Sequence, residues 1–387
     1  ALNTLTLMPG SHPLFGLNTL GGALSLTSKD GFSHPGTVVE AGYGAHQRRM
    51  FGFEHGGHQD NGLNWFVTGN LHRDDGWREA SPSDVRQLFA KLGWSGEATD
   101  LAASLNWADN RLTGNGLQDA RLLANDYRSV YSRPDETQNR SWALNLTGKH
   151  QLNDRLLLSG NAYYRNLRTR TLNGDLNEDA FDQQVYLRRN STAELNALKA
   201  AGYPNLPGAD ETAANTPFPF WRCLAQVALA DEPAEKCNGL LNRSASRQTN
   251  QGLSGQFTLN ADRHQLTAGL GYDASRTRFV QSSQFGYLNP DRSITPVNFY
   301  ADGRELDDSG LPVDSRVDLS GRSRTWSLFA SDSIALHEHW QLTVSARYNT
   351  TRMTLRDHLS PGGGAGSLDG DHRFSRLNPA AGLTFSP

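Results

Sequence analysis

Residues 14–31 carry the sequence LFGLNTLGGALSLTSKDG, which passes from a glycine-rich segment to an alternating segment and then to a polar one. Paired glycines tolerate positive φ angles and the close approach of other backbone, so Gly21 and Gly22 predict a tight turn. The alternation that follows predicts a short strand over 23–27 with its leucines on one face. The part before this stretch is short, and the remainder consists of alternating segments. We therefore expect a small N-terminal part followed by a large β domain.

Alternation of apolar and polar residues persists from Thr37 almost to the end of the chain. In residues 340–349, WQLTVSARYN, most alternate residues are apolar, which places them on one face of a strand. Several such segments exceed 12 residues, although strands in globular proteins average about 5–6. About 12 strands are predicted, at 37–45, 49–57, 63–74, 85–96, 101–109, 141–151, 155–173, 251–260, 264–281, 317–336, 340–355 and 374–385.

The connections between these strands alternate in length. Short polar turns are predicted at 57–62, 96–100, 151–154, 261–263 and 337–339, and long segments at 110–139, 174–250, 282–316 and 356–373. This alternation is typical of a transmembrane β-barrel, which has short periplasmic turns and long extracellular loops. Tryptophans near the strand ends would suit the aromatic girdles of such a barrel; they are Trp65, Trp77, Trp94, Trp107, Trp142, Trp326 and Trp340.

Composition is compatible with this class and excludes others. The 387 residues carry a net charge of −3, which does not predict binding to nucleic acid. No segment approaches the ~18 uninterrupted apolar residues of a membrane helix, whereas a β-barrel crosses with alternating segments of about 10 residues. A passive porin and a soluble β-sandwich that binds a ligand remain as alternatives. No hydrolase, nucleotide-binding or metalloprotease motif is present, and His55 and His58 have no third ligand nearby, so no metal site is expected.

The opening stretch resembles the end of the plug domain of TonB-dependent outer-membrane receptors, where a glycine- and asparagine-containing pattern precedes the first barrel strand. The matching residues are Phe15, Gly16, Asn18, Leu20, Gly21, Gly22 and Thr27, and Lys29 lies one place late. The resemblance implies that residues 1–35 are the C-terminal part of a plug and its linker. Residues 36–387 would then be the first half of a barrel of roughly 22 strands. We therefore expect a fragment of a longer receptor.

The resemblance also implies an activity. Members of this family bind a scarce ligand at the cell surface and import it to the periplasm, using force from TonB and its inner-membrane complex. The ligand class stays open among ferric siderophores, haem, cobalamin-like cofactors and sugars, and the chain would also contact outer-membrane lipid and lipopolysaccharide. The TonB-coupling segment is expected to lie outside this chain. No covalent chemistry, bound cofactor or nucleic-acid partner is expected, and the location is the outer membrane of a Gram-negative bacterium.

The longest predicted loop, residues 174–250, contains both cysteines of the chain. In an oxidising extracellular compartment Cys223 and Cys237 are expected to form a disulfide, with a metal pair or two free thiols as alternatives. Good helix formers with a capping pattern predict a helix over 192–201, and 223–229 predicts a second short helix. A structured lid over the barrel mouth is one interpretation of this loop, and a rigid protective loop is the other.

Candidate ligand contacts come from two places. The loop at 11–18 would reach the cavity through Phe15 and Asn18, and the segment before Cys223 offers Phe218, Phe220, Trp221 and Arg222. Aromatic side chains grip flat or apolar ligands. They also form the internal core of a structured loop, and the sequence leaves both possibilities open.

Overall fold

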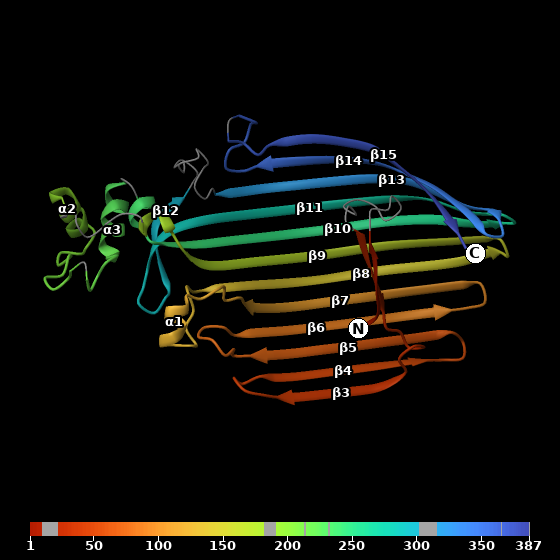
Figure 1. Ribbon diagram of the computed structural model, residues 1–387, viewed down its shortest axis with the longest axis horizontal. Helices are drawn as coiled ribbons and strands as arrows, with labels where there is room; N and C mark the ends of the chain where they lie inside the picture. The colour runs from red at the N-terminus through yellow and green to blue at the C-terminus, as the bar shows by residue number, and fades with distance from the viewer. Residues whose placement is uncertain are drawn as a thin grey trace.

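The computed structural model describes residues 1–9, 22–181, 191–212, 214–230, 233–301, 316–364 and 366–386. Most of them form one antiparallel sheet (Figure 1). From β3 to β11 each strand pairs with the next one in the chain, and the same holds from β13 to β15. β11 pairs with β13 along most of its length and with the short strand β12 near its end. The strands are β3 (Gly36–Tyr43), β4 (Arg49–His58), β5 (Leu63–Asp74), β6 (Ser83–Ser95), β7 (Thr99–Thr113), β8 (Asp135–Asn153), β9 (Leu156–Leu176), β10 (Gly239–Ala261), β11 (His264–Leu288), β12 (Ile294–Ala301), β13 (Val317–His337), β14 (Trp340–Asp357) and β15 (Gly370–Phe385).

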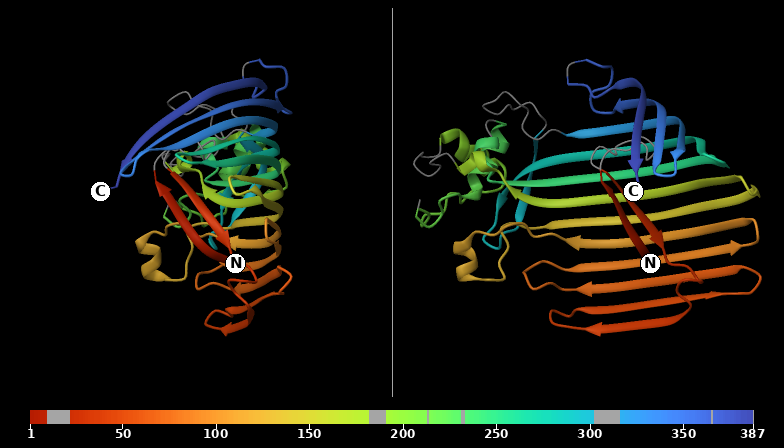
Figure 2. Two further views of the ribbon diagram at one scale, coloured as in Figure 1. Left: turned by 90° about the vertical axis from the view of Figure 1, so that its right-hand side faces the viewer. Right: turned by 45° about the vertical axis from the view of Figure 1, so that its right-hand side comes forward.

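The sheet is curved rather than flat. Seen along its strands, it bends from β3 toward β15 like part of a cylinder wall (Figure 2). The short turns, such as those joining β8 to β9 and β13 to β14, lie at one end, and the long connections with the helices lie at the other (Figure 1). The predicted alternation of short and long connections is confirmed, and so are the twelve predicted strands.

The two faces of the sheet differ in polarity because successive side chains point to opposite faces. The concave face carries polar pairs, for example the Ser327 hydroxyl that donates to the Asn349 amide oxygen at 2.8 Å. The convex face carries exposed leucines, valines and aromatics, among them Leu253, Leu270 and Leu328. An apolar outer surface around a polar interior is the arrangement of a barrel wall in a membrane.

Aromatic side chains mark two levels on the convex face. Part-way along the strands, Trp142 stacks on Tyr164 at 5.0 Å between ring centroids, and Tyr272 packs on Trp326 at 4.6 Å. Near the short-turn end, Trp340 packs on Phe385 at 4.8 Å. Aromatic girdles occupy both interfaces of a membrane barrel. The first level, which also includes Trp107 and Tyr348, is called the outer aromatic belt below.

A separate two-stranded hairpin precedes the sheet. β1 (Leu2–Pro9) pairs with β2 (Gly22–Ser28), and Figure 2 shows this hairpin on the concave side of the sheet. The strand predicted at 23–27 is confirmed as β2, while β1 was not predicted. Gly22 has the positive φ, +143°, that its sequence suggested. Residues 10–21, including Phe15, Gly16, Asn18, Leu20 and Gly21, lie outside the described residues.

Ionic contacts hold the segment after β2 on the concave face. The Lys29 ammonium lies 2.6 Å from a carboxylate oxygen of Glu54 in β4, and Asp30 lies 3.6 Å from Lys91 in β6. The Gly31 carbonyl lies 3.2 Å from a ring nitrogen of His58. A Cβ on Gly31 would come 1.9 Å from the Gly57 carbonyl oxygen, so only glycine permits this close approach.

The helices belong to the long connections. They are α1 (Ala120–Asn125), the 3-10 turn η2 (Glu178–Phe181), α2 (Thr192–Ala200), α3 (Phe220–Leu229) and α4 (Pro233–Lys236). The helix predicted over 192–201 is confirmed as α2, and Ser191 and Glu194 complete the capping box at its start. No described helix is both long and apolar enough to cross a membrane.

The three largest differences from the predicted sheet concern β10, β11 and β12. β10 begins at Gly239 instead of 251, β11 continues to Leu288 instead of 281, and β12 lies inside a segment predicted as loop. At about 3.3 Å per residue the 25 residues of β11 span about 80 Å, far more than the 9–11 residues that cross a bilayer. The extra length projects beyond the outer aromatic belt. There Leu240 and Leu241 are both buried, and Leu240 and Phe285 pack in the core around the disulfide, so the alternation of a lipid-facing strand disappears.

Candidate functional site

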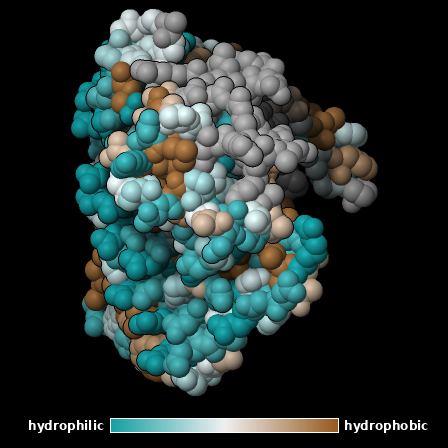
Figure 3. All heavy atoms as spheres, turned by 90° about the vertical axis from the view of Figure 1, so that its left-hand side faces the viewer, coloured by the Kyte–Doolittle hydropathy of each residue, from teal (hydrophilic) through white to brown (hydrophobic). Residues whose placement is uncertain are grey.

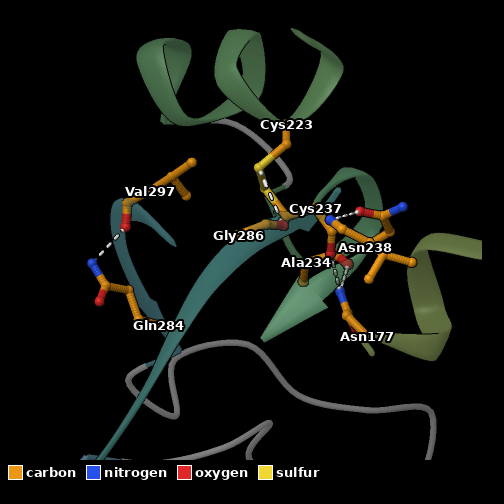
Figure 4. Close-up of a disulfide and its surroundings, with 9 residues drawn as sticks. Asn177, Cys223, Ala234, Cys237, Asn238, Gln284, Gly286 and Val297 are labelled. Atoms are coloured by element: carbon orange, nitrogen blue, oxygen red, sulfur yellow. Dashed lines mark hydrogen bonds between the residues drawn. A yellow bond between two sulfur atoms is a disulfide. The ribbon is translucent and has the colours of Figure 1, made fainter. Parts of the chain in front are cut away.

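The connection from β9 to β10 folds into a small helical unit at the long-loop end. Cys223 in α3 and Cys237 after α4 form a disulfide across 14 residues (Figure 4). Closing a loop of this size stabilises the folded form by about 3 kcal/mol in the chain-entropy model. The Asn177 amide donates to the carbonyls of Ala234 and Cys237, the latter at 2.8 Å. We call residues 191–212 and 214–230 with α4 the cap.

The cap has its own apolar core in two parts. One part surrounds the disulfide and includes Phe285 and Val297 from β11 and β12, which fastens the cap to the extended strands. The other joins α2 to α3 through Leu198, Trp221 and Ala225, all at most 4% exposed. The Trp221 indole N–H donates to Glu211 at 2.6 Å. Burial of these side chains explains why the cap is ordered.

A pocket of about 580 Å³ opens between the cap, the β7–β8 connection and the β11–β12 turn. Five aromatic side chains line it: Tyr131, Phe181, Phe218, Phe220 and Tyr287. Phe181 meets Phe218 edge to face at 4.7 Å, and Phe220 packs on Tyr287 at 5.2 Å. Figure 3 views the molecule from this end and shows hydrophobic areas among mostly hydrophilic side chains. The volume and the aromatic lining suit a small organic ligand.

Two arginines bring positive charge to this pocket. Arg292 lies over the Tyr131 ring at 5.0 Å and donates to the Tyr131 carbonyl at 2.5 Å. Burial lowers the pKa of the Arg292 guanidinium from its usual value, as expected for a cation in partly apolar surroundings. Arg121 pairs with Asp119 at 2.9 Å while its side chain remains 91% exposed. The pocket can therefore receive an anionic group beside an aromatic surface.

A clip next to Arg292 fixes the β11–β12 turn. Arg133 of the β7–β8 connection lies 2.5 Å from Asp291. Hydrogen bonds from the hydroxyl and the backbone N–H of Ser293, with Arg133 nearby, lower the pKa of Asp291 to about 2. Asp291 is thus ionised at any pH the cell surface meets, and the pocket wall keeps its geometry.

The predicted ligand contacts fall in different places. Phe218 and Phe220 line the pocket, with Phe218 40% exposed. Trp221 and Arg222 are each only 4% exposed, because α3 turns them into the cap, so they are not the exposed contacts that the sequence suggested. This agrees with the alternative that part of the aromatic cluster forms the loop's own core. Phe15 and Asn18 lie outside the described residues, and their function stays a prediction.

Sequence reasoning missed Tyr131, Phe181, Tyr287 and Arg292. They come from three segments far apart in the chain: Tyr131 from the β7–β8 connection, Phe181 from η2, and Tyr287 and Arg292 from the end of β11 and the turn after it. The only signal was the number of aromatics in the long segments. No group of three or more metal-binding side chains occurs in the part of the chain that the structure describes.

A second hollow lies on the concave face, with a volume of about 720 Å³. Its lining is polar and includes Lys91, Asp273 and Arg347, and the Tyr163 hydroxyl donates to Asp273 at 2.6 Å. Asp30 and Phe32, from the segment after the N-terminal hairpin, also reach it. This hollow is the polar interior of the wall, into which the N-terminal residues already extend.

The comparison with protein families identifies the class. A model described as TonB dependent receptor-like, beta-barrel, matches residues 75–387, so the chain belongs to the TonB-dependent receptor family. Family membership places it in the outer membrane of Gram-negative bacteria, among receptors and not among enzymes. The match begins after the N-terminal hairpin. No curated protein sequence matches the chain.

Solved structures show the same fold at low sequence identity. The unliganded ferric citrate transporter FecA aligns with a TM-score of 0.60 at 11% identity, covering 98% of this chain and 46% of that one. The siderophore receptor PiuA from Acinetobacter baumannii gives 0.59 at 13% identity, with 99% and 52% covered, and the copper transporter OprC gives 0.55 at 12%, with 98% and 47%. The chain therefore spans about half the length of these receptors and corresponds to about half of their barrel.

Proposed function

We propose that the receptor containing this chain imports an iron chelate, with a ferric siderophore as the substrate class, and that the aromatic pocket makes the first contact at the cell surface. The observation that supports this most directly is the pocket itself, in which Phe218, Phe220 and Arg292 offer aromatic faces beside a positive charge. Aromatic catecholate or carboxylate chelates of iron combine a flat apolar surface with negative charge. Solved relatives carry ferric citrate, siderophores or copper, and this lining favours an anionic aromatic chelate.

The proposed mechanism follows from the barrel geometry. A barrel of this size would leak unless something occluded it, and we propose that residues 1–35 are the end of the plug that does so. The ion pair Lys29–Glu54 joins this segment to the wall. Moving the plug requires energy that the outer membrane does not supply, so TonB and its inner-membrane complex would provide it.

The test uses the full-length receptor in cells starved of iron. Uptake of radiolabelled ferric catecholate, ferric hydroxamate and ferric citrate is measured for the wild type, for a Phe218→Ala/Phe220→Ala variant and in a strain without TonB. We expect TonB-dependent uptake of one chelate class, with surface binding reduced roughly thirtyfold in the double variant, since two aromatic contacts of ~1 kcal/mol each are removed.

Leu117→Ala is the matched control, because Leu117 is 95% exposed in the β7–β8 connection and is not among the residues that line the pocket. Its uptake should equal that of the wild type. Uptake that continues without TonB would contradict active transport and support the passive porin. TonB-dependent uptake with unchanged binding in the double variant would place the ligand site elsewhere.

A further inference from the structure

A smaller pocket lies next to the aromatic pocket, between the cap and the β11–β12 hairpin. Its volume is about 320 Å³. Tyr203 lines it from the end of α2, Leu224 and Val227 line it from α3, and Pro296 and Val297 line it from β12. Among the described residues, no charged side chain lines this space. We call it the apolar pocket.

One face of α3 connects the two pockets. Phe220, Leu224 and Val227 follow one another at intervals of four and three residues, which places them on the same side of a helix. Phe220 lines the aromatic pocket, whereas Leu224 and Val227 line the apolar pocket. The same helix face therefore passes from one pocket into the other within two turns.

The β11–β12 hairpin forms the facing wall. Tyr287 of β11, which is opposite Thr295 of β12, borders both pockets. The Gln284 amide donates to the Val297 carbonyl at 2.8 Å and holds this part of β12 on β11 (Figure 4). Arg292, in the turn, precedes Pro296 by four residues, or about 13 Å of extended chain. A positive charge and an apolar pocket thus lie within reach of one small molecule.

The apolar pocket stands far outside the membrane. Tyr287 lies 15 residues beyond Tyr272 of the outer aromatic belt in the same strand, which corresponds to about 50 Å along β11. Aromatic belts lie at the headgroup level, so the acyl chains of membrane lipids lie on the other side of the belt. An occupant of the apolar pocket therefore comes from solution.

The lining also leaves apolar surface in contact with water. Leu224, Val227 and Tyr287 are only partly buried where they pack against the core around the disulfide. Removing such surface from water is favourable, so an apolar group that enters the pocket gains affinity without needing a polar partner.

We propose that the apolar pocket binds one short aliphatic chain of the same molecule whose anionic aromatic group occupies the aromatic pocket. The substrate class is then an amphiphilic chelate that carries an alkyl or acyl tail. The volume lies at the lower end of the range of about 300–1,000 Å³ for ligand pockets, which suits a single short chain. This inference rests on the proposed function, because the aromatic pocket has to hold the head of the ligand.

The experiment uses the full-length receptor in phosphatidylcholine nanodiscs and a series of benzoates with a straight alkyl chain at ring position 4, from methyl to octyl. Equilibrium dialysis gives the dissociation constants, and empty nanodiscs correct for partition into lipid. Each fully buried methylene should raise the affinity about fourfold. We expect a rise of at least tenfold from methyl to butyl, and a constant affinity once the pocket is full.

A variant that fills the apolar pocket locates the effect. Ala228 lines the pocket from α3 and is exposed, so Ala228→Phe should bring the ratio of butyl to methyl affinity close to one. Ala193→Phe is the matched control, because Ala193 is exposed in α2 and is not among the residues that line the pocket. It should keep the ratio of the wild type. A ratio of dissociation constants does not depend on how much of each receptor is folded.

Two outcomes overturn the proposal. Equal affinity of the wild type for the methyl and butyl probes would do so without any variant. Hexanoate that binds as tightly as the hexyl benzoate would show that the tail binds alone and that no single molecule spans the two pockets.

The uptake experiment separates this inference from the proposed function. TonB-dependent uptake of an untailed chelate, together with equal affinities along the alkyl series, would overturn the tail site and leave the proposed function standing. Affinities that rise with chain length and lose this rise in Ala228→Phe would support the tail site even if no iron chelate were imported.

Discussion

At the residue scale, burial separates two aromatic side chains that are close neighbours in the sequence. Trp221 is 4% exposed in the cap core, whereas Phe218 is 40% exposed at the pocket. Trp221→Ala should destabilise the cap by about 3–5 kcal/mol, the usual effect of removing a large buried side chain, and Phe218→Ala should have little effect on stability. Limited proteolysis of the cap in intact cells measures the difference. Equal protection in both variants would contradict the assignment of Trp221 to the core.

The clip between Arg133 and Asp291 gives a prediction about pH. The pKa of Asp291 is lowered to about 2 from an ordinary 3.8, so its contribution is complete above the ordinary value and is lost as the pH falls through about 2. Pepsin, which is active in acid, should cleave near the β11–β12 turn faster in Asp291→Asn than in the wild type at pH 4. The two rates should converge only near pH 2, and convergence already at pH 4 would contradict the lowered pKa.

At the element scale, the disulfide should stabilise the cap without being needed for the sheet. Cys223 and Cys237 lie in the cap core, away from the membrane-level strands. The double variant Cys223→Ser/Cys237→Ser should keep the heat-modifiable gel mobility of a folded barrel. Its cap should lose about 3 kcal/mol and become sensitive to protease. A variant that no longer forms the heat-modifiable species would show that the cap is required for assembly of the wall.

The strands also show what a sequence can and cannot reveal. Alternation located every membrane-level strand, because one face meets lipid and the other meets a polar interior. It lost β10 before residue 251 and missed β12, since neither face there meets lipid and apolar residues such as Leu240 and Val297 pack in the core around the disulfide instead. Capping chemistry at Ser191 located α2, a purely local signal.

The pocket could not be predicted in the same way. It combines Tyr131 of the β7–β8 connection, Phe218 of the cap and Tyr287 of β11, and their proximity depends on the strand order, the cap and the clip at Asp291. Local sequence patterns therefore predict strands and helices, whereas a binding site depends on contacts between loops that are far apart in the chain.

At the scale of the whole molecule, the sheet is an incomplete cylinder with β3 and β15 at its edges. An unpaired backbone group in hydrocarbon costs several kcal/mol, so a membrane-embedded wall of this kind has to be closed by further strands. We therefore expect that one cysteine introduced in β14 and one introduced opposite it in β15 cross-link within this chain. Cysteines introduced on the free edges of β3 and β15 should cross-link to further strands only in the full-length receptor.

The most direct test of the central claim is a spin-label scan along β14 in the full-length receptor, reconstituted in a bilayer. Labels at Val344, Ala346 and Tyr348 should be accessible to oxygen dissolved in the lipid. Labels at Ser345, Arg347 and Asn349 should be accessible to a water-soluble nickel chelate or shielded by the protein. Accessibility that alternates between oxygen and the nickel chelate from one residue to the next, in this order, would establish that the convex face meets lipid. Uniform access of the nickel chelate to both sets would contradict the account, because the sheet would then stand in water.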